Sequence, residues 1–154
     1  MSLEVLTLAV GPDEDTRIKE MASLVCDIAG ATGATVLLLH VFSQSAYDEG
    51  VAEAGYDPDD PPPAHTLASR LENIDRLSFA FEEADIEYRI RGEIGDVTDR
   101  IVSVAKETNT DMLFVGGRKR SPTGKAVFGS TSHRVLMNAP CPVTFVRQDV
   151  TDAE

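Results

Sequence analysis

Short apolar segments alternate with segments of helical periodicity along the chain, and this alternation constrains the possible fold more than any other feature. The run Ala34–Phe42 is almost continuously apolar, as expected of a strand that is buried on both faces of a parallel sheet. Similar β-prone runs are Val5–Val10, Met112–Val115 and Pro142–Arg147. The segment Ile86–Arg91 instead alternates apolar and polar side chains, which is typical of an edge strand.

Segments with apolar side chains at helical spacing lie between these runs. They begin near Asp13–Thr16, at Ala64, at Val97 and at Ser130, and the last is expected to end at Met137. Strands and helices therefore follow each other in the order β-α-β-α-β-α-β-α-β, as in sheets built from right-handed parallel crossovers. The sequence predicts an α/β fold: a single doubly wound, mostly parallel five-stranded sheet with helices on both faces.

The segment 43–63 has a different composition from the rest of the chain. It contains six Asp and Glu residues, no Lys or Arg, and ends in three consecutive prolines. This composition predicts a long, flexible acidic loop. Two roles remain open for it: a solvated connector, which we favour, and a lid over a site at the strand ends. A chain of 154 residues suits one core, so we expect residues 1–154 to form a single domain with a tail at 148–154.

The chain is strongly acidic, since 26 Asp and Glu against 14 Lys and Arg give a formal net charge of −12. This excess argues against nucleic-acid binding, which needs a positive surface. Charge repulsion of this kind keeps halophilic proteins soluble, and we hypothesise a salt-loving source. No apolar run approaches the roughly 20 residues that span a bilayer, and Met1–Glu4 lacks the features of a signal peptide. We therefore expect a cytoplasmic protein that does not enter membranes.

A cluster of cationic side chains follows the apolar run Met112–Val115. Four of the 14 Lys and Arg residues fall within eight positions: Arg118, Lys119, Arg120 and Lys125. Glycines and the start of a helix flank them, and both features let backbone N–H groups approach an anion. The segment Val115–Thr131 is therefore interpreted as an anion-binding loop, and a solvated basic turn is the alternative.

The same segment resembles the C-terminal half of the universal stress protein family. Nucleotide-binding members of that family carry a glycine, two residues, a second glycine, nine residues, and then glycine with Ser or Thr. Gly116 matches the first glycine, and Gly129-Ser130 match the closing pair. The interval 120–128 has the family's length, and Lys119 occupies the position of the second glycine. The resemblance continues through the segment 136–143. It implies a sheet with strand order 3-2-1-4-5.

The resemblance also implies an ATP site, with or without Mg²⁺, at the point where the strand order reverses. Phosphate contacts would come from Gly116, Gly117, Lys119, Gly129, Ser130 and Thr131. Val41 and Val115 would line the region of the base and sugar. The family's Asp at the end of the first strand is missing here, or shifted to Asp13. Lys119 could bind phosphate as a point charge, or it could fill the site.

These features favour a stress-response regulatory or sensor module that binds adenine nucleotide. We expect no catalysis beyond slow ATP hydrolysis, because the chain shows no clear general base, and no metal site of histidines, because the three histidines are not spaced as ligands. The alternative is a dimeric interaction protein of the same fold that binds no nucleotide. For both functions the family resemblance implies a homodimer that pairs through the last strand, Val143–Val146.

Overall fold

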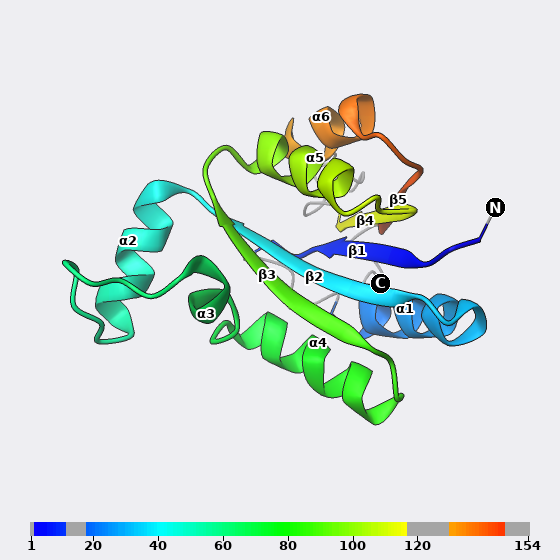
Figure 1. The fold of residues 1–154 in the computed structure, drawn as a ribbon, viewed down its shortest axis with the longest axis horizontal. Helices are drawn as coiled ribbons and strands as arrows, with labels where there is room; N and C mark the ends of the chain where they lie inside the picture. The colour runs from blue at the N-terminus through cyan, green and yellow to red at the C-terminus, as the bar shows by residue number, and fades with distance from the viewer. Residues whose placement is uncertain (1, 12–17, 117–129, 147–154) are drawn as a thin grey trace, which may run out of the picture.

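The computed structural model describes residues 2–11, 18–116 and 130–146. Its sheet has five parallel strands in the order β3-β2-β1-β4-β5 (Figure 1). The strands are β1 (Val5–Ala9), β2 (Thr35–Phe42), β3 (Tyr88–Ile94), β4 (Met112–Gly116) and β5 (Val143–Val146). The predicted fold class and strand order are confirmed.

Helices cover both faces of this sheet, as predicted. α1 (Ile18–Thr32) and α4 (Glu72–Glu83) lie on one face, and α5 (Val97–Glu107) and α6 (Ser130–Asn138) lie on the other (Figure 1). Alternate residues of β2 point to the two layers: Leu38 packs with the α1 and α4 side chains, and Leu39 packs with those of α5 and α6. Both are fully buried, which explains why this strand is apolar along its length.

The predicted acidic loop 43–63 is wrong over its first half, where the structure has the helix α2 (Gln44–Glu53). Ser43 caps this helix, because its side chain accepts a hydrogen bond from a backbone N–H of the first turn. Tyr47 and Val51 lie one turn apart and are buried, so they fix one face of the helix to the protein. Two apolar side chains are enough to hold an otherwise acidic helix, and too few to produce a clear helical pattern.

The predicted continuous helix from Ala64 is also wrong, because the chain forms two helices here. α3 spans Ala64–Ala68 and packs against β3, whereas α4 begins at Glu72 and packs against α1. Leu71 between them is extended, with φ −72° and ψ 138°. Both helices turn their apolar side chains inward, so the apolar spacing stays helical across the break. Periodicity alone therefore does not reveal that there are two helices.

The strand β3 begins and ends later than predicted. The sequence predicted a strand at Ile86–Arg91, but β3 spans Tyr88–Ile94 and the chain turns at Gly95, whose φ is +143°. Gly92 lies within the strand for a packing reason, since α3 crosses it at close range. The predicted edge position of this strand is confirmed.

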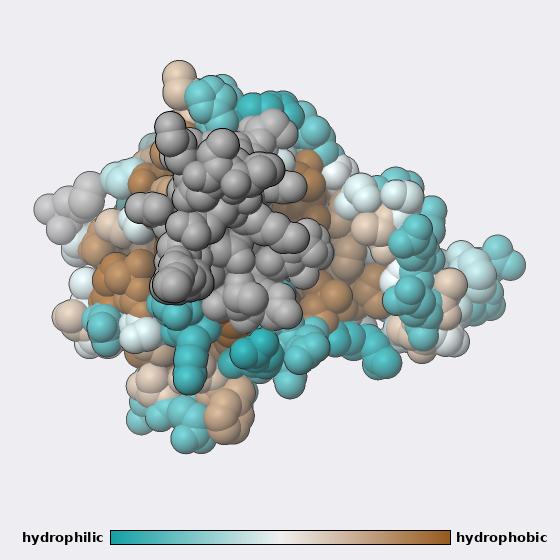
Figure 2. Space-filling model, turned by 180° about the vertical axis from the view of Figure 1, so that it is seen from behind, coloured by the Kyte–Doolittle hydropathy of each residue, from teal (hydrophilic) through white to brown (hydrophobic). Residues whose placement is uncertain are grey.

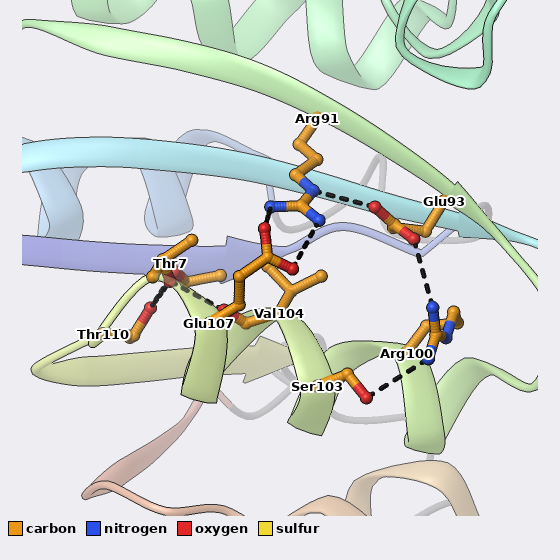
Figure 3. Close-up of polar contacts among 9 residues, drawn as sticks. Thr7, Arg91, Glu93, Arg100, Ser103, Val104, Glu107 and Thr110 are labelled. Atoms are coloured by element: carbon orange, nitrogen blue, oxygen red, sulfur yellow. Dashed lines mark hydrogen bonds and ion pairs between the residues drawn. The ribbon is translucent and has the colours of Figure 1, made fainter.

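A chain of ion pairs joins the edge strand β3 to α5 (Figure 3). The Arg91 guanidinium donates to Glu93 at 2.8 Å and to both carboxylate oxygens of Glu107 at 3.0 and 3.1 Å. Arg100 lies 3.5 Å from the other side of Glu93. The bond from Arg91 lowers the pKa of Glu107. The polar positions of the alternating edge strand thus serve to fasten α5 across the sheet.

Within the described part of the chain, none of the helices has the length and apolar character needed to cross a bilayer.

Candidate functional site

The carboxyl ends of β1 and β4 form the point at which the strand order reverses. From β1 the chain proceeds toward β2, and from β4 it proceeds toward β5 on the opposite side. Ala9 of β1 lies beside Val115 of β4 in the parallel register. Open sheets of this class bind ligands in the crevice outside the strand ends at such a reversal, so the predicted site residues are expected at this edge.

The structure brings several predicted residues to this edge. Val41 of β2 and Val115 of β4 are each the next-to-last residue of their strand, and both are buried in one apolar cluster with side chains of α5 and α6. Gly116 is the last residue of β4, in register with Val146 of β5. Thr131 lies exposed in the first turn of α6, which begins at Ser130. The predicted site residues Asp13, Gly117, Lys119 and Gly129 lie outside the described residues.

A further contact, which the sequence did not reveal, fixes the start of α6 at this edge. The Ser132 hydroxyl donates a hydrogen bond to the carbonyl oxygen of Gly116 at 3.0 Å, and Ser132 is buried. This bond holds the first turn of the helix against the last residue of β4. The positive end of the α6 dipole therefore lies at the strand ends. The three adjacent hydroxyl residues 130–132 were the available signal, but which of them turns inward depends on the packing.

The start of α5 lies beside α6. Asp96 caps α5 by accepting the backbone N–H of Asp99 at 3.0 Å. The guanidinium of Arg134 on α6 lies 3.7 Å from the carboxylate of Asp96 and 4.0 Å from that of Asp99. All of these side chains are about half exposed or more, so the pairs orient the two helices more than they stabilise them.

His40 lies in β2, and its ring reaches the backbone of Val10 directly after β1. Its Nδ1 lies 2.7 Å from the carbonyl oxygen of Val10, and the N–H of Val10 donates to Leu39 at 2.8 Å. A carbonyl oxygen only accepts, so Nδ1 carries the proton. His40 is therefore a buried, hydrogen-bonded histidine, and its partner is a backbone group that the sequence alone did not indicate.

Acidification through the ordinary pKa of histidine, 6.5, is expected to reduce the free energy of unfolding. Burial lowers the pKa of folded His40 below that value, so the unfolded chain binds the proton more tightly and unfolding is favoured as the pH falls. One proton gives at most about 1.4 kcal/mol per pH unit. Urea unfolding of the wild type and His40→Gln between pH 5 and 7.5 checks this, and equal slopes in the two proteins would contradict it.

Comparison with known proteins places the chain in a family. A model of the universal stress protein family matches residues 6–147. The chain belongs to this family. A universal stress protein of Mycolicibacterium smegmatis is 30% identical over 67 residues, which are 43% of this chain and 52% of the relative. One of Methanothermobacter thermautotrophicus is 36% identical over 66 residues, 43% of this chain and 44% of the relative. These alignments thus span about half of each curated relative.

Solved structures of the family share the fold over nearly the whole chain. A universal stress protein of Archaeoglobus fulgidus superposes with a TM-score of 0.70 at 23% identity, covering 95% of this chain and 99% of that one. A structure from the same organism in complex with dAMP gives 0.66 at 19% identity, with 95% and 99% covered. An Arabidopsis thaliana family member with AMP bound gives 0.63 at 19% identity, with 98% and 96% covered.

Proposed function

We propose that this universal stress protein is a regulatory or sensor module that binds an adenine nucleotide, with ATP as the ligand. The observation that carries the proposal is the start of α6, which Ser132 holds against Gly116 at the reversal of the strand order. A helix N-terminus in this position attracts phosphate through its free N–H groups and its dipole. Two family members with this fold have been solved with dAMP and AMP, which supports the choice of ligand.

In the proposed complex the phosphates lie over Gly116 and the first turn of α6, at Ser130 and Thr131. Gly117, Lys119 and Gly129 complete the phosphate site, Val41 and Val115 border the base and sugar, and Asp13 approaches the sugar. Mg²⁺ accompanies the triphosphate if it is needed to neutralise its charge. No residue is proposed as a catalyst.

Calorimetric titration with ATP and Mg²⁺ tests this function. We expect binding to the wild type, and affinity about tenfold weaker in Lys119→Ala, because a charge-assisted contact to phosphate is lost. Lys106→Ala is the matched control, since it removes the same charge from α5. Tighter binding by Lys119→Ala would show that the lysine fills the site. If the wild type gave no heat of binding at millimolar ATP, the nucleotide proposal would be wrong.

The alternative function is a dimeric interaction protein that binds no nucleotide. It is favoured by the edge position of β5 and by the exposure of Leu136 and Met137 on the neighbouring α6, at 36% and 70%. A homodimer that pairs through Val143–Val146 is compatible with both functions. The alternative therefore stands only if the titration is negative while the molar mass in solution is that of a dimer.

We further propose that the protein works in the cytoplasm of a salt-loving organism, as one domain. The support is the net charge of −12, whose repulsion salt would screen. The free energy of unfolding should therefore be higher in molar KCl than at low salt, as measured by urea unfolding. A value that does not rise with KCl would contradict the halophilic origin.

A further inference from the structure

Thr98, in the first turn of α5, carries a buried hydroxyl without a hydrogen-bond partner. The residue is 2% exposed, and its Oγ1 is enclosed and unpaired. Among the residues that the structure describes, no other buried side-chain nitrogen or oxygen is left in this state. Buried polar groups are nearly always hydrogen-bonded, so an exception calls for a water molecule, a ligand or a functional reason.

The start of α5 is fixed at the carboxyl end of β2. Gly95, directly before the cap residue Asp96, donates its backbone N–H to the carbonyl oxygen of Phe42 at 2.9 Å. Phe42 is the last residue of β2 and follows Val41, which is proposed above to border the base and sugar. The first turn of α5 therefore lies at the strand end where the nucleoside is proposed to bind.

Thr98 faces the sheet. It lies one turn before Ile101 on the same side of the helix, and Ile101 packs in the apolar cluster that contains Val41 and Val115. The outer surface at the top of the molecule, where α5 and α6 lie, is largely hydrophilic (Figure 2). Because Thr98 precedes Ile101, its hydroxyl lies on the inner side of α5 and nearer to the carboxyl ends of the strands than that cluster.

The charges around the start of α5 favour the uncharged nucleoside over the phosphates as a neighbour. Asp96 and Asp99 lie at this end of the helix, and the guanidinium of Arg134 is 3.7 and 4.0 Å from their carboxylates. Two carboxylates beside one guanidinium repel a triphosphate, whereas the base and the ribose carry no charge. A hydroxyl both donates and accepts, so it can pair with an amine, a ring nitrogen or a ribose hydroxyl.

We propose that the Thr98 hydroxyl binds the nucleoside half of the nucleotide and so adds α5 to the site at β1, β4 and α6. This inference rests on the nucleotide function proposed above. The side chain of a threonine in a helix has two accessible rotamers, so the hydroxyl can turn toward a ligand that offers it a partner. The nucleoside then supplies the hydrogen bond that the protein does not.

Calorimetric titration of Thr98→Val with ATP and with AMP tests the proposal. Valine keeps nearly the shape of threonine without the hydroxyl, so both nucleotides, which share the nucleoside, should bind about fivefold more weakly. Thr98→Ser keeps a hydroxyl and should bind within about twofold of the wild type. Without nucleotide, the midpoint of urea unfolding of Thr98→Val should not fall, because the hydroxyl that is removed has no partner in the protein.

Thr110→Val is the matched control, because it removes a buried hydroxyl that does have partners. The Thr110 hydroxyl lies 2.7 Å from those of Thr7 and Thr108. It precedes the amino end of β4, whereas the proposed site lies at the carboxyl ends. This variant should lower the urea midpoint by roughly 0.5 M and leave the affinity for ATP unchanged.

The outcomes separate this inference from the proposed function. If the wild type binds neither ATP nor AMP, the proposed function fails and the inference fails with it. If the wild type binds and Thr98→Val binds equally well, only the inference is wrong. A loss for ATP with AMP spared would place the contact on the phosphates. A fall in the urea midpoint like that of Thr110→Val would show that the hydroxyl has a structural partner, such as a buried water molecule. Either of these two results would overturn the inference.

Discussion

Replacement of Gly92 by alanine is expected to lower the free energy of unfolding by about 2–3 kcal/mol, the cost of overpacking a well-filled interior. A Cβ atom at this position of β3 would lie 2.3 Å from the carbonyl oxygen of Ala64, 2.5 Å from its carbonyl carbon and 2.8 Å from the backbone nitrogen of His65. These are backbone atoms, so no side-chain rotation can relieve the overlap. The start of α3 would have to move away from the sheet.

The same substitution at Gly30 is the control, because it should have the opposite sign. Gly30 lies within α1, and a Cβ atom there would meet only the end of Ile86 at 3.9 Å. Alanine in a helix is favoured over glycine by about 0.5–1 kcal/mol. Urea unfolding of both variants measures the difference. A Gly92→Ala protein as stable as the wild type would mean that α3 does not approach β3 as the structure shows.

The sheet was predictable from the sequence because its signals are local. Ala34–Phe42 and Met112–Val115 are apolar without interruption, and a strand buried on both faces requires this. The alternation of polar and apolar side chains in Ile86–Arg91 indicates an edge strand without any knowledge of the strand pairing. The order of the strands came from the family resemblance, because no local signal specifies which strands are neighbours.

The elements that the sequence did not predict depend on contacts between distant residues. The helix α2 is held by Tyr47 and Val51, and their burial depends on Phe42 and Leu67 in other parts of the chain. The break before α4 arises because α3 meets β3 whereas α4 meets α1. In the candidate site, Gly116, Val41 and Val115 could be chosen from the family pattern, but the bond from Ser132 to Gly116 could not, since it joins residues 16 positions apart.

Replacement of Phe42 by alanine is expected to cost about 3–4 kcal/mol and to release α2 and α3. Phe42 is the last residue of β2 and is 4% exposed. Its ring makes edge contacts with His40 at 4.6 Å and with Tyr47 at 5.9 Å between ring centres. It anchors a small apolar cluster, separate from the two main ones, whose buried members are Phe42, Tyr47, Val51, Leu67 and Ala68. Few other buried contacts hold α2.

Because this cluster is separate from the main core, the damage should be local. Amide hydrogen exchange is expected to accelerate in Gln44–Glu53 well before it does in β1 and β4, since regions with few buried contacts open independently. Phe79→Ala is the matched control: Phe79 on α4 is 64% exposed, and its loss should change stability by no more than about 0.5 kcal/mol. Uniform acceleration across the sheet in Phe42→Ala would mean that α2 and α3 unfold with the whole domain.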